Sequence, residues 1–146
     1  MSRLWSRALP VLLALGIPGT WPGVARAELP PWVYGEQQRQ APVVVRLRIQ
    51  RAERSGSEAR VSGQVLRVWR QPEALSLKSG QSIGLRYSLP PERAPGLVGP
   101  SSLPLPRKGE VVTAWLRALP EKPGLFAPAA GGRSFGPSME EVREPR

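Results

Sequence analysis

The chain has 146 residues and a formal net charge of +10, and it contains no cysteine, histidine, aspartate or asparagine. These absences exclude disulfide bonds, the usual zinc and copper sites, Asp-based calcium loops and the Ser–His–Asp and Cys–His catalytic systems. We therefore expect a protein that binds no metal and no cofactor and that is not an enzyme.

Residues 1–27 have the features of a cleavable signal peptide. Two arginines precede a short apolar run at residues 8–17, and Ala25 and Ala27 match the small-residue cleavage pattern. A helix that crosses a bilayer needs about 20 apolar residues, which is about twice the length of this run. The sequence therefore predicts export by the general secretory route and cleavage before Glu28. The product would be a soluble periplasmic or extracellular protein without stable membrane insertion.

The mature chain is expected to begin with an extended segment, residues 28–42, which has prolines near both ends. Residues 42–53 then alternate with a period of two, which predicts a half-buried strand. One face contains Val43, Val45, Leu47 and Ile49, and the other contains Val44, Arg46, Arg48 and Gln50. Residues 58–71 form a second strand whose apolar phase slips between Val65 and Leu66. Such a slip predicts a bulge or bend of the kind that a closed barrel needs.

The remaining segments are shorter and are separated by turns. A third strand is predicted at residues 83–89, and a Pro-rich loop at 90–109 has no room for a helix or a central strand. A fourth strand is predicted at 109–119 because its valines and threonine favour strand over helix. Residues 125–135 contain a short fifth strand, and residues 136–146 are expected to form a disordered tail.

These elements predict an all-β fold: a small five-stranded OB-like barrel or sandwich over residues 43–135, with the long Pro-rich loop between strands 3 and 4. The segments GQVLRVWRQ…LKSGQSIGLRY (63–87), KGEVVTAWL (108–116) and AAGGRSF (129–135) resemble small exported bacterial β-barrel domains of the OB-like, netrin/TIMP-like type. The resemblance implies the fold. This chain departs from the disulfide-bonded members because it lacks their inhibitory N-terminal cysteine, which argues against metalloprotease inhibition.

The most promising binding surface is a basic face on the first three strands. Its candidate residues are Arg46, Arg48, Arg67, Trp69, Arg70 and Arg86. The alternative interpretation is a solvated basic surface with Trp69 partly buried, since an Arg-rich composition can also reflect a GC-rich genome.

The stretch PAAGGRSFGP (128–137) resembles a phosphate-binding loop at first sight. A P-loop needs a lysine where this chain has Arg133 and a glycine where it has Ala127. We therefore interpret the stretch as the closing turn of the barrel, with Phe135 in the core. Arg133 and Ser134 remain candidate site residues.

Three functions are compatible with these observations. The first is a non-catalytic binding module whose partner is an unknown protein or an anionic component of the cell envelope. The alternative is an OB-type domain that binds single-stranded oligonucleotides or other polyanions, although export disfavours a nucleic-acid partner. A second alternative is an enzyme that uses Glu110 or Glu121 with Arg133 and Ser134.

Overall fold

The computed structural model describes residues 28–90 and 102–146. The predicted signal peptide at 1–27 and part of the Pro-rich loop, residues 91–101, lie outside the described residues.

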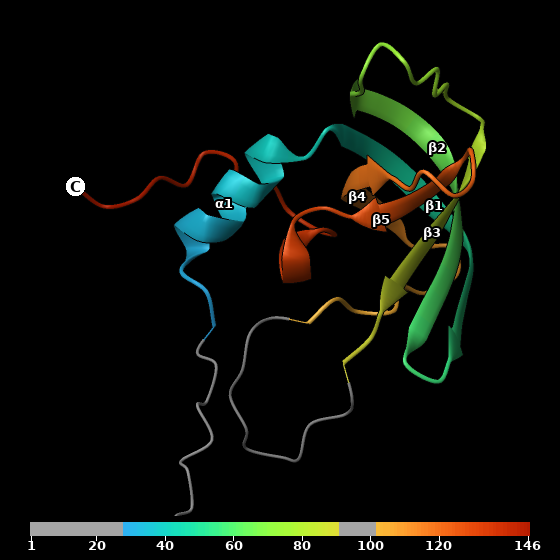
Figure 1. The fold of residues 1–146 in the computed structure, drawn as a ribbon, viewed down its shortest axis with the longest axis horizontal. Helices are drawn as coiled ribbons and strands as arrows, with labels where there is room; N and C mark the ends of the chain where they lie inside the picture. Colours follow the sequence, from blue (N-terminus) through green and yellow to red (C-terminus); the bar gives the residue numbers. More distant parts are fainter. Residues whose placement is uncertain (1–27, 91–101) are drawn as a thin grey trace, which may run out of the picture.

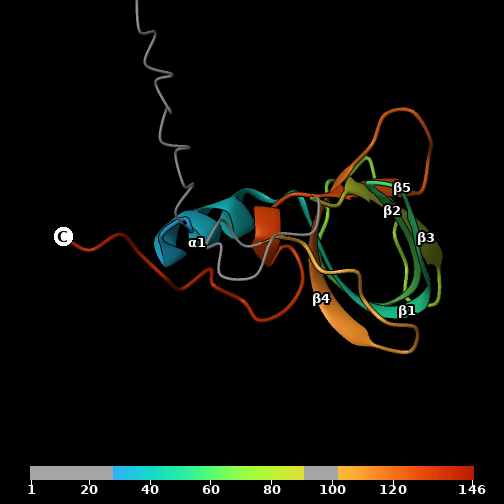
Figure 2. The same cartoon turned by 90° about the horizontal axis from the view of Figure 1, so that it is seen from below.

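Five strands form one closed barrel (Figure 1). They are β1 (Val43–Ser55), β2 (Glu58–Arg70), β3 (Ser82–Ser88), β4 (Val111–Ala118) and β5 (Leu125–Pro128). The order around the barrel is β1-β2-β3-β5-β4, with β4 pairing back to β1, and the β3–β5 pair alone is parallel. Figure 2 looks into the resulting ring. The prediction of a small all-β, five-stranded fold is confirmed, and the architecture is a barrel and not a sandwich.

The inward positions of the strands follow the predicted alternation. Val43, Val45, Leu47 and Ile49 of β1 are at most 1% exposed, and they pack with Ile83, Leu85 and Tyr87 of β3 in one core. Period-two patterning therefore located the buried face correctly, because successive side chains of a strand point to opposite sides of the sheet.

The predicted irregularity in β2 is a bulge at Leu66. Arg46 pairs with Arg67 and Leu47 pairs with Val65, so Leu66 has no partner on β1. Gly63 lies three residues before Leu66, and a Cβ atom at Gly63 would come within 3.3 Å of the Arg48 carbonyl oxygen. The small residue thus allows β1 and β2 to approach closely where the ribbon bends.

The stretch at residues 128–137 forms the closing turn that the sequence predicts. β5 ends at Pro128, and a short 3₁₀ helix, η1 (Gly131–Arg133), follows with Gly131 at a φ of +51°. Phe135 then bridges to Ala114 of β4 and packs edge-on against the Tyr87 ring at 5.8 Å.

The prediction of an extended segment at 28–42 is wrong, because a helix, α1 (Pro31–Gln40), occupies most of it. Pro31 stands at the first helical position, where its fixed φ is suited to a helix and its missing N–H costs nothing. The helix has no strong apolar stripe. Polar contacts hold it instead: the buried Gln38 side chain donates to the Arg133 carbonyl oxygen at 2.9 Å and accepts from the Met139 N–H.

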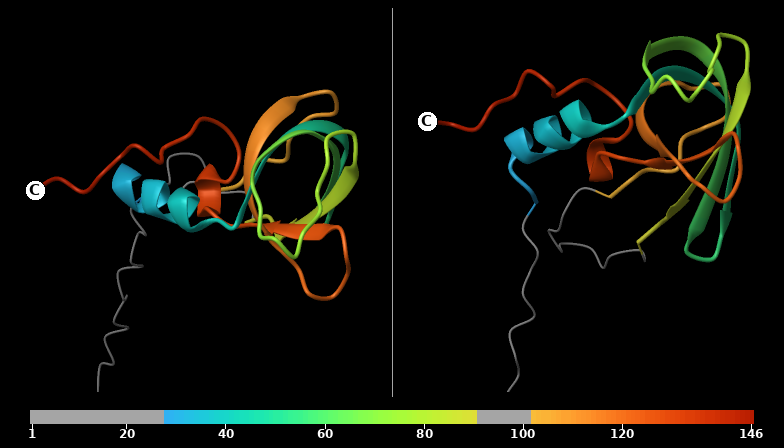
Figure 3. Two further views of the ribbon diagram at one scale, coloured as in Figure 1. Left: turned by 90° about the horizontal axis from the view of Figure 1, so that it is seen from above. Right: turned by 45° about the horizontal axis from the view of Figure 1, so that its top comes forward.

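The prediction of a disordered tail at 136–146 does not describe its first half. Arg39 donates to the carbonyl oxygens of Glu140 and Val142, which lays this part of the chain along α1. Figures 2 and 3 show α1 and the C-terminal segment side by side, outside the barrel. Within the described part of the chain, no helix is long and apolar enough to span a membrane.

Candidate binding surface

The outer side of the β2–β1–β4 sheet brings together four of the predicted site residues. Arg46 of β1 lies directly opposite Arg67 of β2 and opposite Thr113 of β4. Residues that face each other across neighbouring strands project to the same side of the sheet. We call the surface formed by Arg46, Arg48, Arg67 and Trp69 the arginine–tryptophan face.

Arg67 and Trp69 form a stacked pair on this face. The guanidinium carbon of Arg67 lies 3.9 Å from the centroid of the Trp69 ring, and the tryptophan is 51% exposed. A cation over an exposed indole contributes about 0.5–1 kcal/mol, which is enough to orient both side chains. Tryptophan and arginine are enriched at the energetic centres of protein interfaces, so this pair is the main candidate for a ligand contact on the face.

The arginines of the face are not neutralised by the rest of the described structure. The ion pairs found within residues 28–90 and 102–146 involve other arginines, namely Arg39, Arg51, Arg60, Arg70, Arg86 and Arg133. Arg46, Arg48 and Arg67 therefore present three positive charges toward solvent on one side of the barrel.

An open cavity of about 430 Å³ adjoins the arginine–tryptophan face. Val44 of β1 and Trp115 of β4, which are 5% and 1% exposed, form its buried part. Trp69 and Arg70 of β2 line it as well. The C-terminal segment completes it with Gly136, Pro137, Ser138 and Glu140. We call this the tryptophan cavity. The Trp115 Nε1 is buried and makes no hydrogen bond in the described structure.

Arg70 has a structural role at the edge of this cavity. Its guanidinium donates to the carbonyl oxygens of Gln38, Arg39 and Ala41 at 2.8–3.1 Å, at the C-terminal end of α1. It also forms an ion pair with Glu140. A cation at this end of a helix satisfies carbonyl groups that lack an intrahelical partner. Arg70 therefore binds α1 and the C-terminal segment to the barrel and is not free to meet a ligand charge.

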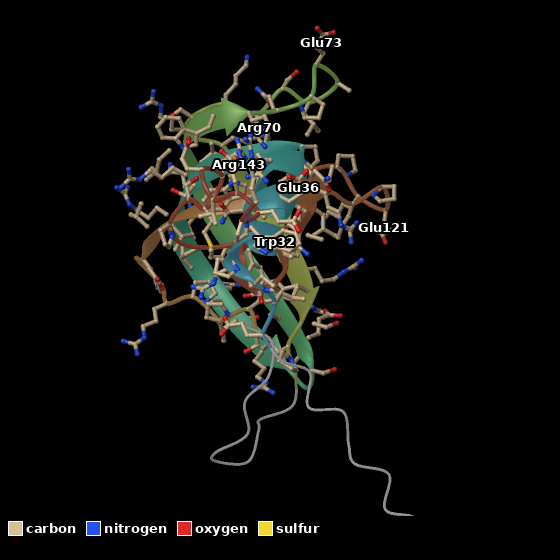
Figure 4. The ribbon with its side chains drawn as sticks, turned by 90° about the vertical axis from the view of Figure 1, so that its left-hand side faces the viewer. Trp32, Glu36, Arg70, Glu73, Glu121 and Arg143 are labelled. Atoms are coloured by element: carbon tan, nitrogen blue, oxygen red, sulfur yellow. The ribbon has the colours of Figure 1, made fainter. Side chains whose placement is uncertain are left out.

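The structure does not bring the other three candidates to this face. Arg86 pairs with Glu121 at 3.4 Å beside a different cavity. Arg133 lies over the Tyr34 ring and pairs with Glu28 at 3.5 Å. Figure 4 shows Glu121 at the periphery of the molecule, well separated from Arg70.

The residues of the enzyme hypothesis have separate partners. The fully buried Ser134 hydroxyl donates to the Gly131 carbonyl oxygen and accepts from the Ala130 N–H, both within 3 Å. The Glu110 carboxylate accepts from the Arg107 N–H, and Glu121 faces Arg86. Ser134 thus stabilises the closing turn, and within residues 28–90 and 102–146 the hydrogen bonds of its hydroxyl involve backbone groups and no carboxylate. In the described residues, no group of three or more potential metal-ligating carboxylates occurs.

Sequence reasoning missed most of the tryptophan cavity. Trp115 lies within the predicted fourth strand, but its alignment with Val44 depends on the register of β1 and β4. The residues of the C-terminal segment gave no signal because that segment has no clear period. In comparisons with known proteins, no family model and no curated protein matches this chain.

Proposed function

We propose that this protein is an exported, non-catalytic binding module that recognises an acidic partner through the arginine–tryptophan face. One observation carries the proposal: three arginines without a carboxylate partner in the described structure lie on the same side of the sheet as an exposed tryptophan, and one of them stacks on its ring. Within this proposal, the predicted signal peptide places the module in the periplasm or outside the cell. The netrin/TIMP-like resemblance supplies a precedent for the barrel, not for the ligand.

The pairing of Arg46 with Arg67 supports an anionic ligand. Like charges that face each other on a sheet destabilise it, and a bound carboxylate between two guanidinium groups removes that repulsion. Arginine also suits this role better than lysine because its planar fork can donate two parallel hydrogen bonds to one carboxylate.

The test compares two double variants that remove the same charge from different places. R46Q/R48Q removes two cations from the face, whereas R51Q/R60Q removes two exposed arginines that pair with Glu53 and Glu58. We expect the first variant to bind fluorescein-labelled polyglutamate about tenfold more weakly than the wild type, a change of about 1.4 kcal/mol. The second variant should bind nearly as well as the wild type.

The measurement is fluorescence anisotropy at low and moderate ionic strength, because screening weakens exposed charge interactions. Equal losses in both double variants would mean that only the overall positive charge attracts the polymer, and the proposed face would then be rejected.

A single-stranded oligonucleotide is the second candidate ligand. Exposed tryptophan beside arginine is the arrangement on which unpaired bases stack, with about 1–3 kcal/mol lost per base when the aromatic residue is removed. The same anisotropy assay with labelled oligothymidine distinguishes an oligonucleotide ligand from an acidic polypeptide ligand. Tighter binding of the oligonucleotide than of polyglutamate, with a loss in a Trp69→Ala variant, would favour the nucleic acid.

A further inference from the structure

We propose that the tryptophan cavity takes an aromatic side chain of an acidic protein segment, whose carboxylates pair with Arg46 and Arg67. This inference rests on the proposed function and narrows its partner to a protein. It joins two neighbouring features of the outer sheet, the cationic face and the apolar cavity, into one site.

The residues that line the cavity favour an aromatic ring of the ligand over a purely charged group. Val44, Trp69, Trp115 and Pro137 are among the residues that line it, and the charge of Arg70 is balanced by Glu140. A volume of about 430 Å³ falls within the range of about 300–1,000 Å³ for sites that enclose an organic ligand. An offset or edge-on contact with the exposed indole of Trp69 would add to the apolar burial of an aromatic ring.

The charges beside the cavity require that the ring come from an acidic segment. Trp69 belongs to both surfaces, since it lines the cavity and stacks with Arg67. A ligand that inserts a ring beside Trp69 therefore places its flanking groups within reach of Arg67 and of its opposite neighbour, Arg46. Carboxylates at those positions match the unpaired cations, whereas lysines would add to their repulsion.

The residue types of the site favour a protein partner. Tryptophan and arginine are the residues most enriched at the energetic centres of protein interfaces, and lysine is depleted there. All the cations of the arginine–tryptophan face are arginines. The segment of this chain that borders the cavity cannot supply the ring, because residues 136–146 contain no aromatic side chain. The occupant we infer is therefore a separate acidic polypeptide.

The test uses two fluorescein-labelled peptides that differ at one residue, with glutamates flanking either a central phenylalanine or a central alanine. We expect the purified protein to bind the phenylalanine peptide about tenfold more tightly, measured by anisotropy. Trp69→Ala should bring the ratio of the two peptide affinities close to one. Thr113→Leu, which narrows the cavity from β4, should reduce this ratio without removing the Trp69–Arg67 pair. Trp32→Ala is the matched control, because Trp32 lies on α1 and does not line the cavity.

The charge variant separates this inference from the proposed function. R46Q/R48Q should weaken both peptides by a similar factor and leave their ratio unchanged. If the wild type binds both peptides equally, the aromatic pocket is wrong while the acidic-partner function stands. If it binds neither, both proposals fail for polypeptide ligands. A phenylalanine peptide with glutamines in place of glutamates that binds as tightly as the acidic one would overturn the pairing with Arg46 and Arg67.

Discussion

Gln38 connects three parts of the chain through one side chain. It is fully buried, and its amide nitrogen donates to the carbonyl oxygens of Arg133 and Pro137 while its amide oxygen accepts from the Met139 N–H. A buried amide that satisfies backbone groups is costly to remove, because those groups then lose their partners without gaining water. Gln38 therefore fixes α1 against both η1 and the C-terminal segment.

Replacing Gln38 with alanine should lower the free energy of unfolding by about 2–3 kcal/mol, since it leaves buried backbone groups unpaired. Urea denaturation followed by circular dichroism measures the change. Gln40→Ala is the control: Gln40 is exposed on the same helix, and its loss should alter stability by less than about 0.5 kcal/mol. Similar effects of the two substitutions would contradict the role given to Gln38.

Tyr87 provides a pH-dependent test of packing in the barrel core. Its hydroxyl donates to the Pro104 carbonyl oxygen at 2.8 Å, and burial raises the pKa of Tyr87 from 10.0 to about 12. Because the folded-state pKa lies above the unfolded value, the contribution of this group to stability is complete below pH 10. It decreases as the pH rises toward 12, because the unfolded chain releases the proton first.

Comparison with Tyr87→Phe isolates this contribution from other groups that titrate at high pH. At pH 8 the wild type should be more stable than the variant by about 1 kcal/mol, the usual value of one hydrogen bond. The difference should shrink between pH 10 and pH 12 in urea denaturation experiments. A difference that stays constant over this range would show that the Tyr87 hydroxyl is not protected from ionisation.

At the scale of elements, the sequence predicts the strands well because their pattern is local. The alternation of Val43, Val45 and Leu47 with the arginines of β1 indicates which face is buried, and this alone places Arg46 and Arg48 on the outside. The phase slip at Val65–Leu66 likewise indicates the bulge. Beyond the bulge the alternation resumes in the new phase, which puts both Arg67 and Trp69 on the outer side.

The helix could not be predicted in the same way. α1 has no apolar stripe and no side-chain cap, and it depends on contacts with Arg70, Arg133 and Met139, which are distant in sequence. The same reason explains why the contacts of Arg70 could not be predicted. As a residue of β2 it resembles its exposed neighbours, but only the folded chain reveals the helix end that it binds. The tryptophan cavity was also beyond sequence reasoning, since it combines two strands in a specific register with the C-terminal segment.

At the scale of the whole molecule, the structure has two layers that are stabilised by different kinds of contact. The barrel rests on an apolar core, whereas α1 and the C-terminal segment are attached to it by polar contacts through Gln38, Arg39 and Arg70. A helix of ten residues is short for independent stability, which usually requires about 12–15. The outer layer should therefore open locally at a lower free energy than the barrel unfolds.

The lower local stability of the outer layer predicts the effect of removing residues 138–146. The truncated chain loses the Met139 N–H that Gln38 binds, the Glu140 partner of Arg70 and the two carbonyl groups that Arg39 binds. Amide hydrogen exchange in α1 should become at least about tenfold faster, a loss of about 1.4 kcal/mol in local stability. Exchange in β1 and β2 should change little.

Removal of residues 144–146 alone is the control, because the contacts to Gln38, Arg39 and Arg70 that the longer truncation removes come from residues 139–142. Uniformly faster exchange through the barrel would instead mean that the two layers unfold as one unit. The truncation also removes Ser138 and Glu140 from the border of the tryptophan cavity while leaving the arginine–tryptophan face in place. The acidic alanine peptide should then bind at least as tightly as before, because Arg70 loses its Glu140 partner. The advantage of the phenylalanine peptide should decrease, because the ring would lose one side of its enclosure.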